Sequence, residues 1–255
     1  MTYRTHAVPT QPWVMHQRWH DLLFAHWPVE ECQLRGLVPA HLEIDRFDGL
    51  CWIGIVPFWM SNVRPRGLPA IAGLSTFLEL NVRTYVRHRG KPGVYFFSLD
   101  ASSRIAVMIA RKGFHLPYHL AEMAMAGGDC PEAQAVSPGG APNTIIYESR
   151  RVQPNAPAAE LQISYRPTAP PVPYDDDVLA RWLTARYCLY TCSSDGSFFC
   201  GEIHHDPWPL QAAEADIMLN TMTEGIGITL PDVPPLLHFS ERIDVRIWPL
   251  NRCLI

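Results

Sequence analysis

Residues 77–88, FLELNVRTYVRH, carry the clearest strand pattern in the chain. Its side chains alternate in character with the two-residue period of a β-strand. The polar and ionisable set is Glu79, Asn81, Arg83 and Tyr85, and the opposite set is Leu78, Leu80, Val82, Thr84 and Val86. The pattern predicts a strand with one face against an apolar core and the other face equipped for chemistry.

The polar face has two readings. It can line a cavity inside a closed sheet, or it can be a solvated outer face, where such residues are ordinary. Glu79, Asn81 and Arg83 stand about 7 Å apart along one face. In a partly dry cavity, Glu79 and Arg83 could hold a carboxylate, orient a proton donor or neutralise each other.

The segments around this strand read mostly as strands with turn signals between them. Strands are predicted at 41–47, 50–60, 94–100, 119–126, 144–152, 161–167, on both sides of the Asp195-Gly196 turn, at 210–220 and at 238–249. Short helices are predicted at 30–36, 104–112 and 175–185. Residues 62–75, rich in Gly and Pro, predict a long loop, and residues 11–27 read as a helix or as a short helix running into a strand.

This order of elements predicts a mainly antiparallel α+β fold, with the sheet closed into a barrel and a few short helices. The 24 prolines in 255 residues favour short elements over long helices. Closure removes sheet edges and creates an interior. We expect one domain over residues 1–255.

Composition narrows the function classes. The chain is 47% hydrophobic with a formal net charge of −4, which is typical of a globular protein and gives no basic surface for nucleic acid. No apolar run approaches the ~18 residues of a membrane span, and the N-terminus has no signal-peptide core. We expect a cytoplasmic protein whose seven cysteines stay reduced.

Two clusters could carry further chemistry. Arg111 and Lys112 lie close to His115 and His119, and Lys112 would be an amine nucleophile if it were desolvated. Cations at a helix C-terminus are also ordinary.

Cys188, Cys192, Cys200 and His204 have the composition of a zinc site, but their spacing on a hairpin favours buried free thiols. His205 and Asp206 could supply a base and an orienting carboxylate, although strand alternation lets only one of His204 and His205 face inward. We expect no metal and no cofactor.

Long phrases in the chain resemble the YqjF-like family of uncharacterised bacterial proteins. They are WHDLLFAHWPV (19–29), LRGLVPAHLEID (34–45), VPFWMSNVRPRGLPAIAGLSTFLELNVRTYV (56–86), GVYFFSLDASS (93–103), FHLPYHLAEM (114–123), RYCLYT (186–191), EIHHDPWPLQ (202–211) and RIDVRIWPL (242–250). The family is distantly similar to acetoacetate decarboxylase, and this implies a closed or cone-shaped antiparallel barrel around a cavity. By the same resemblance, Glu79 falls at an active-site glutamate and Arg18 matches an arginine that binds the substrate carboxylate.

The chain departs from the decarboxylases at the residue that does their chemistry. Their Gly-Phe-Pro-Lys-Lys-Leu-Ala phrase, whose first lysine forms a Schiff base, corresponds here to residues 115–121, His-Leu-Pro-Tyr-His-Leu-Ala. Tyr118 and His119 replace the two lysines. A phenol cannot form an imine, so decarboxylation by that route is not expected unless Lys112 reaches the cavity.

The sequence therefore predicts a barrel that binds a small, anionic organic ligand without Schiff-base chemistry. The ligand-binding candidates are Arg18, Asn81, Arg83 and His115, and the candidates for acid–base chemistry are Glu79, Tyr118 and His119. The alternative is a lyase, hydratase or isomerase that uses those last three residues on a carbonyl or enol compound. A structural partner protein is a third reading, and assembly into a homo-oligomer stays open.

Overall fold

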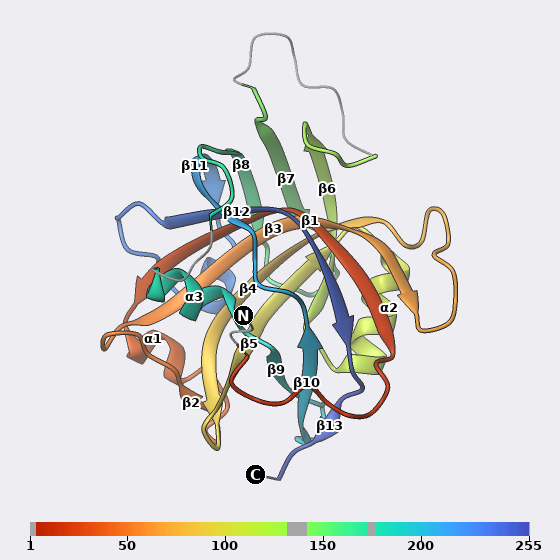
Figure 1. Ribbon diagram of the computed structural model, residues 1–255. Coiled ribbons are helices and arrows are strands. Elements are labelled where there is room, and N and C mark those ends of the chain that lie inside the picture. Colours follow the sequence, from red (N-terminus) through yellow and green to blue (C-terminus); the bar gives the residue numbers. More distant parts are fainter. Residues whose placement is uncertain (1–3, 132–141, 173–176, 255) are drawn as a thin grey trace.

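The computed structural model describes residues 4–131, 142–172 and 177–254, and its strands form one strongly curved sheet (Figure 1). The strands are β1 (Met15–Val29), β2 (Glu43–Ile44), β3 (Cys51–Pro65), β4 (Phe77–His88), β5 (Lys91–Ala101), β6 (Tyr118–Ala126), β7 (Ile145–Arg151), β8 (Glu160–Pro167), β9 (Cys188–Cys192), β10 (Phe198–His204), β11 (Leu210–Asn220), β12 (Leu236–Ile247) and β13 (Asn251–Arg252). The helices are α1 (Glu31–Arg35), α2 (Arg104–Phe114), α3 (Val178–Thr184) and the 3-10 turn Glu224–Ile226.

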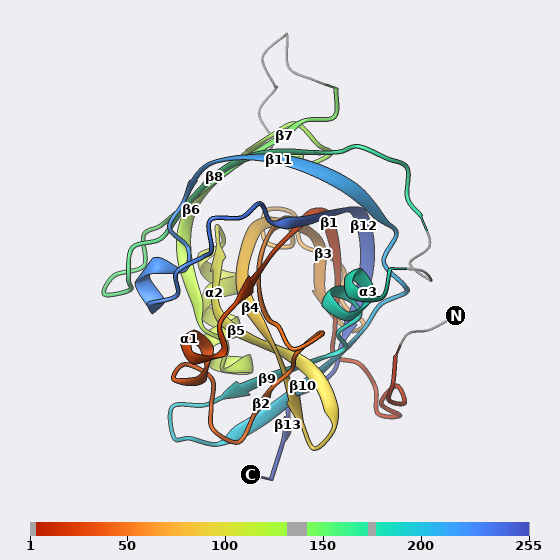
Figure 2. The same cartoon turned by 90° about the vertical axis from the view of Figure 1, so that its left-hand side faces the viewer.

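The sheet closes on itself. Its order runs β5-β6-β7-β8-β11-β12-β1-β3-β4, and the pairing of β4 with β5 completes a ring of nine strands (Figure 2). The β9–β10 hairpin forms a second connection, because β9 pairs with β5 and β10 pairs with β12. Only the β5–β6 and β5–β9 pairings are parallel among the described strands. The predicted mainly antiparallel barrel with a few short helices is confirmed.

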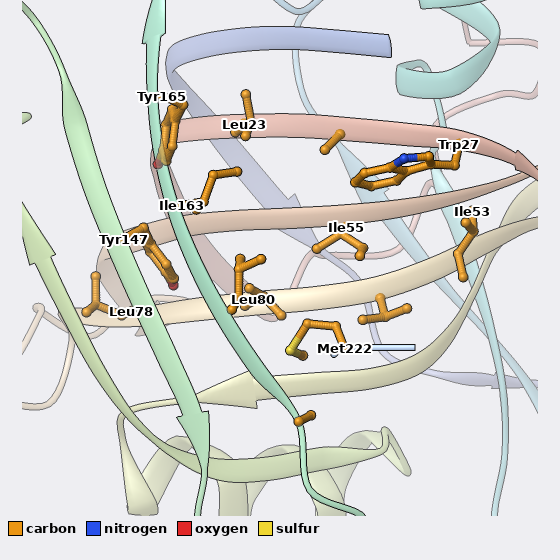
Figure 3. Close-up of a cluster of buried hydrophobic side chains, with 14 of the residues drawn as sticks. Leu23, Trp27, Ile53, Ile55, Leu78, Leu80, Tyr147, Ile163, Tyr165 and Met222 are labelled. Carbon is orange, nitrogen blue, oxygen red and sulfur yellow. The ribbon is translucent and has the colours of Figure 1, made fainter. Parts of the chain in front are cut away.

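Strands β1, β3 and β4 are buried on both faces. One face carries the main apolar core, which includes Leu23, Ile55 and Leu80 (Figure 3). Tyr147 and Tyr165 cross this core, and their hydroxyls donate to the backbone carbonyls of Glu79 and Asp21, respectively. Burial on both faces explains why the sequence of β3 is a continuous apolar run with no alternation.

The prediction for residues 11–27 is wrong where it places a helix, because this segment forms β1. The β1–β3 register shifts between His20 and Ala25, and Asp21 has a positive φ of 50°. A bulge of this kind moves the following side chains to the other face of a strand. The change of phase hides the two-residue period in the sequence.

The prediction of a loop over 62–75 needs a smaller correction, since β3 continues to Pro65 and the loop follows it.

Two helices begin at residues whose side chains cap the first turn. The side chain of Ser103 accepts from the Ala106 backbone N–H ahead of α2, and that of Asp177 accepts from the Ala180 N–H ahead of α3. The predicted start of the last helix at 175–176 lies outside the described residues.

Candidate functional site

A cavity of about 400 Å³ lies on the face of β1, β3 and β4 opposite the main apolar core. We call it the main cavity. Its wall also includes residues of β5, α2, the start of β6, and the segments around 184–189 and 203–208. A volume of this size is typical of a small-molecule site.

Strand β4 supplies the polar wall of the main cavity. Glu79, Asn81 and Arg83 all line it, and their exposed fractions are 3%, 5% and 9%. Leu80 and Val82 point into the apolar core instead. Of the two readings left open by the alternation, the cavity is the one that the geometry supports.

Tyr85 is the next residue on the polar face of β4, but it does not line the main cavity. It is fully buried with Trp52, Val94 and Leu183, and its hydroxyl lies 2.6 Å from Nε2 of His26. Tyr85 therefore belongs to the packing beyond the Arg83 end of the cavity.

Glu79 and Tyr118 form a hydrogen-bonded pair inside the main cavity. The Tyr118 hydroxyl donates to Oε2 of Glu79 at 2.6 Å. Burial raises the pKa of Glu79 to about 8, with a smaller contribution from the charge of Asp100, while the bond from Tyr118 opposes the shift. Burial also raises the pKa of Tyr118 well above its ordinary value. At neutral pH both groups therefore hold their protons.

Arg83 brings a positive charge to the same wall. Its guanidinium carbon lies 5.4 Å from the Phe24 ring centroid and 5.9 Å from that of Tyr85. No carboxylate of the described residues is within salt-bridge distance of it, and its Nε has no hydrogen-bond partner there. The side-chain oxygen of Asn81 is also without a partner in the described structure. The Arg83 Nε and the Asn81 oxygen are available to a ligand, while the Arg83 guanidinium also hydrogen-bonds the Tyr85 side chain.

Arg186 is the second buried arginine of the main cavity, and its contacts differ from those of Arg83. Its Nη1 donates to Asp45 at 2.6 Å and its Nε donates to the carbonyl of Trp182 at 2.7 Å. The guanidinium also stacks over the Trp182 ring at 4.2 Å. Asp45 accepts a further bond from Arg87 at 2.8 Å, so this one carboxylate is the shared counter-charge of two guanidiniums.

Arg186, His205 and Trp208 reach the main cavity from a distant part of the chain. Burial lowers the pKa of His205 to about 4, so the ring is neutral, and its Nδ1 lies 2.7 Å from the carbonyl oxygen of Asp206. Trp208 packs at 4.9 Å from both His205 and Phe24. From the sequence, either His204 or His205 could face the interior. No sequence motif near Arg186 or Trp208 predicted that these two residues line the cavity.

Three predicted site residues do not line the main cavity. Arg18 is bound to Asp244 on β12 at 2.9 Å and is more than a third exposed. His115 follows α2 and lines a second cavity of about 460 Å³ with Arg111 and Thr191. His119 follows Tyr118 on a strand, so its ring points to the other side, where burial lowers its pKa to about 4. Binding or catalytic roles for these three stay predictions.

No amine lines the described part of the main cavity. Lys112 is exposed on α2, and Lys91 pairs with Glu202 beside the β9–β10 hairpin. Tyr118 occupies the position that the resemblance assigns to the imine-forming lysine of the decarboxylases. The wall of the main cavity holds a phenol there instead, hydrogen-bonded to a carboxylic acid.

The cysteine cluster does not form a metal site. Across residues 4–131, 142–172 and 177–254, no group of three or more His, Cys, Asp or Glu side chains converges as metal ligands would. Cys188 and Cys200 lie side by side as free thiols, with their sulfurs 2.7 Å apart.

Among the described residues, no helix has the length and hydrophobicity needed to cross a membrane.

Solved structures with this fold include several enzymes. An acetoacetate decarboxylase-like enzyme from Sphingomonas wittichii aligns with a TM-score of 0.61 at 14% identity, over 99% of both chains. The enduracididine biosynthesis enzyme MppR, in complex with pyruvate, gives 0.61 at 10% identity, over 99% of this chain and 97% of that one. An acetoacetate decarboxylase from Legionella pneumophila gives 0.57 at 11% identity, over 99% and 92%. These likenesses confirm the predicted acetoacetate-decarboxylase-like fold.

The sequence itself matches a family model over residues 16–244, described as an uncharacterized conserved protein, DUF2071. It is also 47% identical over 247 residues to the uncharacterized protein YqjF of Bacillus subtilis, a match that covers 96% of this chain and 95% of that one. The match spans β1 to β12 and so includes every strand that lines the main cavity. The resemblance read from the sequence is confirmed, and the chain belongs to the DUF2071 family.

Proposed function

We propose that this protein binds a small organic anion in the main cavity, without forming a covalent bond to it. The observation that carries the proposal is Arg83, a permanently charged side chain that is 91% buried and has no carboxylate partner in the described structure. Burying an unpaired charge costs several kcal/mol. A ligand carboxylate would supply the missing counter-charge and a bidentate partner for the guanidinium.

The rest of the wall supports an anionic ligand. Glu79 keeps its proton near neutral pH, so it does not repel a carboxylate there. Arg186 has an Nη2 without a partner among the described residues, and this N–H donor suits an anion. MppR, which shares the fold, has been solved in complex with pyruvate, a small organic anion.

A first experiment is native mass spectrometry of gently purified protein, which would detect a retained small molecule directly. Isothermal titration with pyruvate and benzoate would follow, on wild type and on Arg83→Met. We expect Arg83→Met to weaken binding at least tenfold, because a charge-assisted pair is lost. Arg246→Met, on an exposed position of β12, is the matched control and should bind like wild type.

Equal binding by wild type and Arg83→Met would exclude the proposed anion site. Borohydride reduction in the presence of pyruvate tests the covalent route. We expect no mass gain, since the main cavity offers no amine in its described lining. A covalent adduct at Lys112 would contradict the proposal.

Acid–base catalysis is the second candidate function, and the pKa of Glu79 favours it. A carboxylic acid with a pKa of about 8 is well matched to donate or accept a proton near neutral pH. Tyr118 would orient Glu79, and His119 would act only if its ring reached the main cavity. Screening keto and enol acids for turnover or for deuterium exchange in D2O tests this function. If Glu79→Gln binds ligand normally but abolishes exchange, the protein is an enzyme.

A further inference from the structure

The two ends of the main cavity differ: Arg83 lies at one end, and the other end is mostly apolar. The charged side chain of that other end is Arg64, which is bonded to Asn62 and the Leu68 carbonyl. Along β4, its lining runs from Arg83 through Asn81 and Glu79 to Phe77, which span about 20 Å at 3.3 Å per residue. Phe77 directly follows the loop after β3. The Phe77 end lies beside this loop, whose exposed Ile71 and Leu74 line the cavity, so this is the open end and the Arg83 end is the deeper one.

Beside the polar residues of β4, strands β1 and β3 line the cavity with aromatic and aliphatic side chains. Trp19 and Phe58 pack together with ring centroids 5.6 Å apart, and Trp19 also stacks on Trp208 at 6.1 Å. Met60 pairs with Phe77 across β3 and β4, next along the same wall. A three-carbon acid held at Arg83 would leave most of this apolar surface in contact with water.

The outer end of the cavity exposes large apolar side chains. Ile71 and Leu74 come from the loop after β3, and Ile105 and Ile109 come from α2; all four line the main cavity. Their exposed fractions are 58%, 42%, 44% and 50%. Exposed apolar groups that gather at a cavity are typical of a ligand-binding surface.

We infer that the ligand is a carboxylic acid with an extended apolar body, of the medium-chain alkyl or arylalkyl type. Its carboxylate binds Arg83 at the deep end, and its body lies along Trp19, Phe58 and Trp208. The far end of the body covers Ile71 and Ile109. This inference rests on the proposed anion site and adds the chemical class of the ligand.

Titration calorimetry with butanoate, hexanoate, octanoate and the neutral octanamide tests the inference. Each buried methylene contributes about 0.8 kcal/mol, so affinity should rise roughly fourfold per methylene along the acid series. Octanamide should bind at least tenfold more weakly than octanoate, because it lacks the charge that pairs with Arg83.

Two neighbouring residues of α2 make a matched pair of variants. Ile109 lines the main cavity, whereas Met108 is equally exposed, at 51%, and does not line it. We expect Ile109→Asp to weaken octanoate binding about tenfold and to leave butanoate binding unchanged. Met108→Asp should leave both unchanged, and this controls for the added charge.

The outcomes separate the two proposals. If butanoate binds as tightly as octanoate, and Arg83→Met weakens both, the inference about the apolar body is wrong and the anion site stands. If octanamide binds as tightly as octanoate, the anion site is wrong and the inference falls with it. An affinity that rises with chain length and drops in both Arg83→Met and Ile109→Asp supports both.

Discussion

The two buried arginines of the main cavity should respond in opposite ways to the same substitution. Arg83 has no carboxylate partner in the described structure, whereas Arg186 pairs with Asp45 at 2.6 Å. We expect Arg83→Met to raise the free energy of unfolding of the ligand-free protein and Arg186→Met to lower it. Methionine keeps much of the apolar stem in both cases.

The magnitudes follow from what each guanidinium touches. Replacing Arg83 relieves a desolvation cost of several kcal/mol and loses two cation–π contacts, each worth about 0.5–2 kcal/mol. We expect a net gain of about 1–2 kcal/mol. Replacing Arg186 breaks a buried pair, which usually costs about 3–5 kcal/mol. Since Asp45 keeps its bond to Arg87, we expect a loss of about 2–4 kcal/mol.

Urea unfolding, followed by tryptophan fluorescence, measures both changes in the free energy of unfolding, after any copurified ligand has been removed by extensive dialysis. Thermal unfolding measures them a second way, since 1 kcal/mol corresponds to about 2–4 °C in the melting temperature of a protein of this size. Arg83→Met should therefore melt roughly 2–8 °C higher than wild type, and Arg186→Met roughly 4–16 °C lower. If Arg83→Met is as destabilising as Arg186→Met, the charge of Arg83 is already compensated within the protein, and the argument for an anionic ligand is refuted.

Three further predictions concern titrating and hydrogen-bonded groups in or beside the main cavity. Because the folded protein raises the pKa of Glu79 from 4.5 to about 8, its contribution to stability is complete below about pH 4.5 and is lost as the pH rises to about 8. Urea unfolding between pH 5 and pH 8 should therefore show a loss of stability that Glu79→Gln lacks; parallel slopes would show that Glu79 is ionised in the folded state. Tyr118→Phe removes the bond that lowers the pKa of Glu79, so that pKa should move above about 8 in carboxyl-carbon NMR titration, and a downward shift would contradict this arrangement. Tyr85→Phe leaves Nε2 of the buried His26 without its partner and should cost about 1–3 kcal/mol in the same unfolding assay, whereas no loss would mean that water replaces the hydroxyl.

Strand β4 could be predicted from the sequence because its pattern is local. Each face of β4 meets one kind of environment along most of its length, so the side chains alternate without interruption from Phe77. In β1 the bulge at Asp21 changes which residues face the cavity: Gln17 and Trp19 line it before the bulge, and Phe24 lines it after. A pattern that changes phase in its middle matches neither a helix nor a strand.

The candidate site was predicted in part, and the geometry explains the rest. Glu79 and Tyr118, both candidates from the sequence, form a hydrogen-bonded pair, and their roles stay predictions. The strand alternation that lets only one of His204 and His205 face inward also turns His119 away from Tyr118's side of β6. Arg186 precedes β9, which pairs with the distant strand β5, and Trp208 lies between β10 and β11, which both pair with β12. Both positions depend on the closed topology and not on local sequence.

One sheet, a single backbone thick, separates the apolar core from the main cavity. Leu80 packs in the core between Glu79 and Asn81, which face the cavity. Any substitution that shifts Leu80 must move its two neighbours, because the three residues share one rigid backbone. Ligand preference should therefore change with mutations of residues that never touch the ligand. Selection for a new specificity should enrich substitutions in the apolar core behind β4 as well as in the cavity wall.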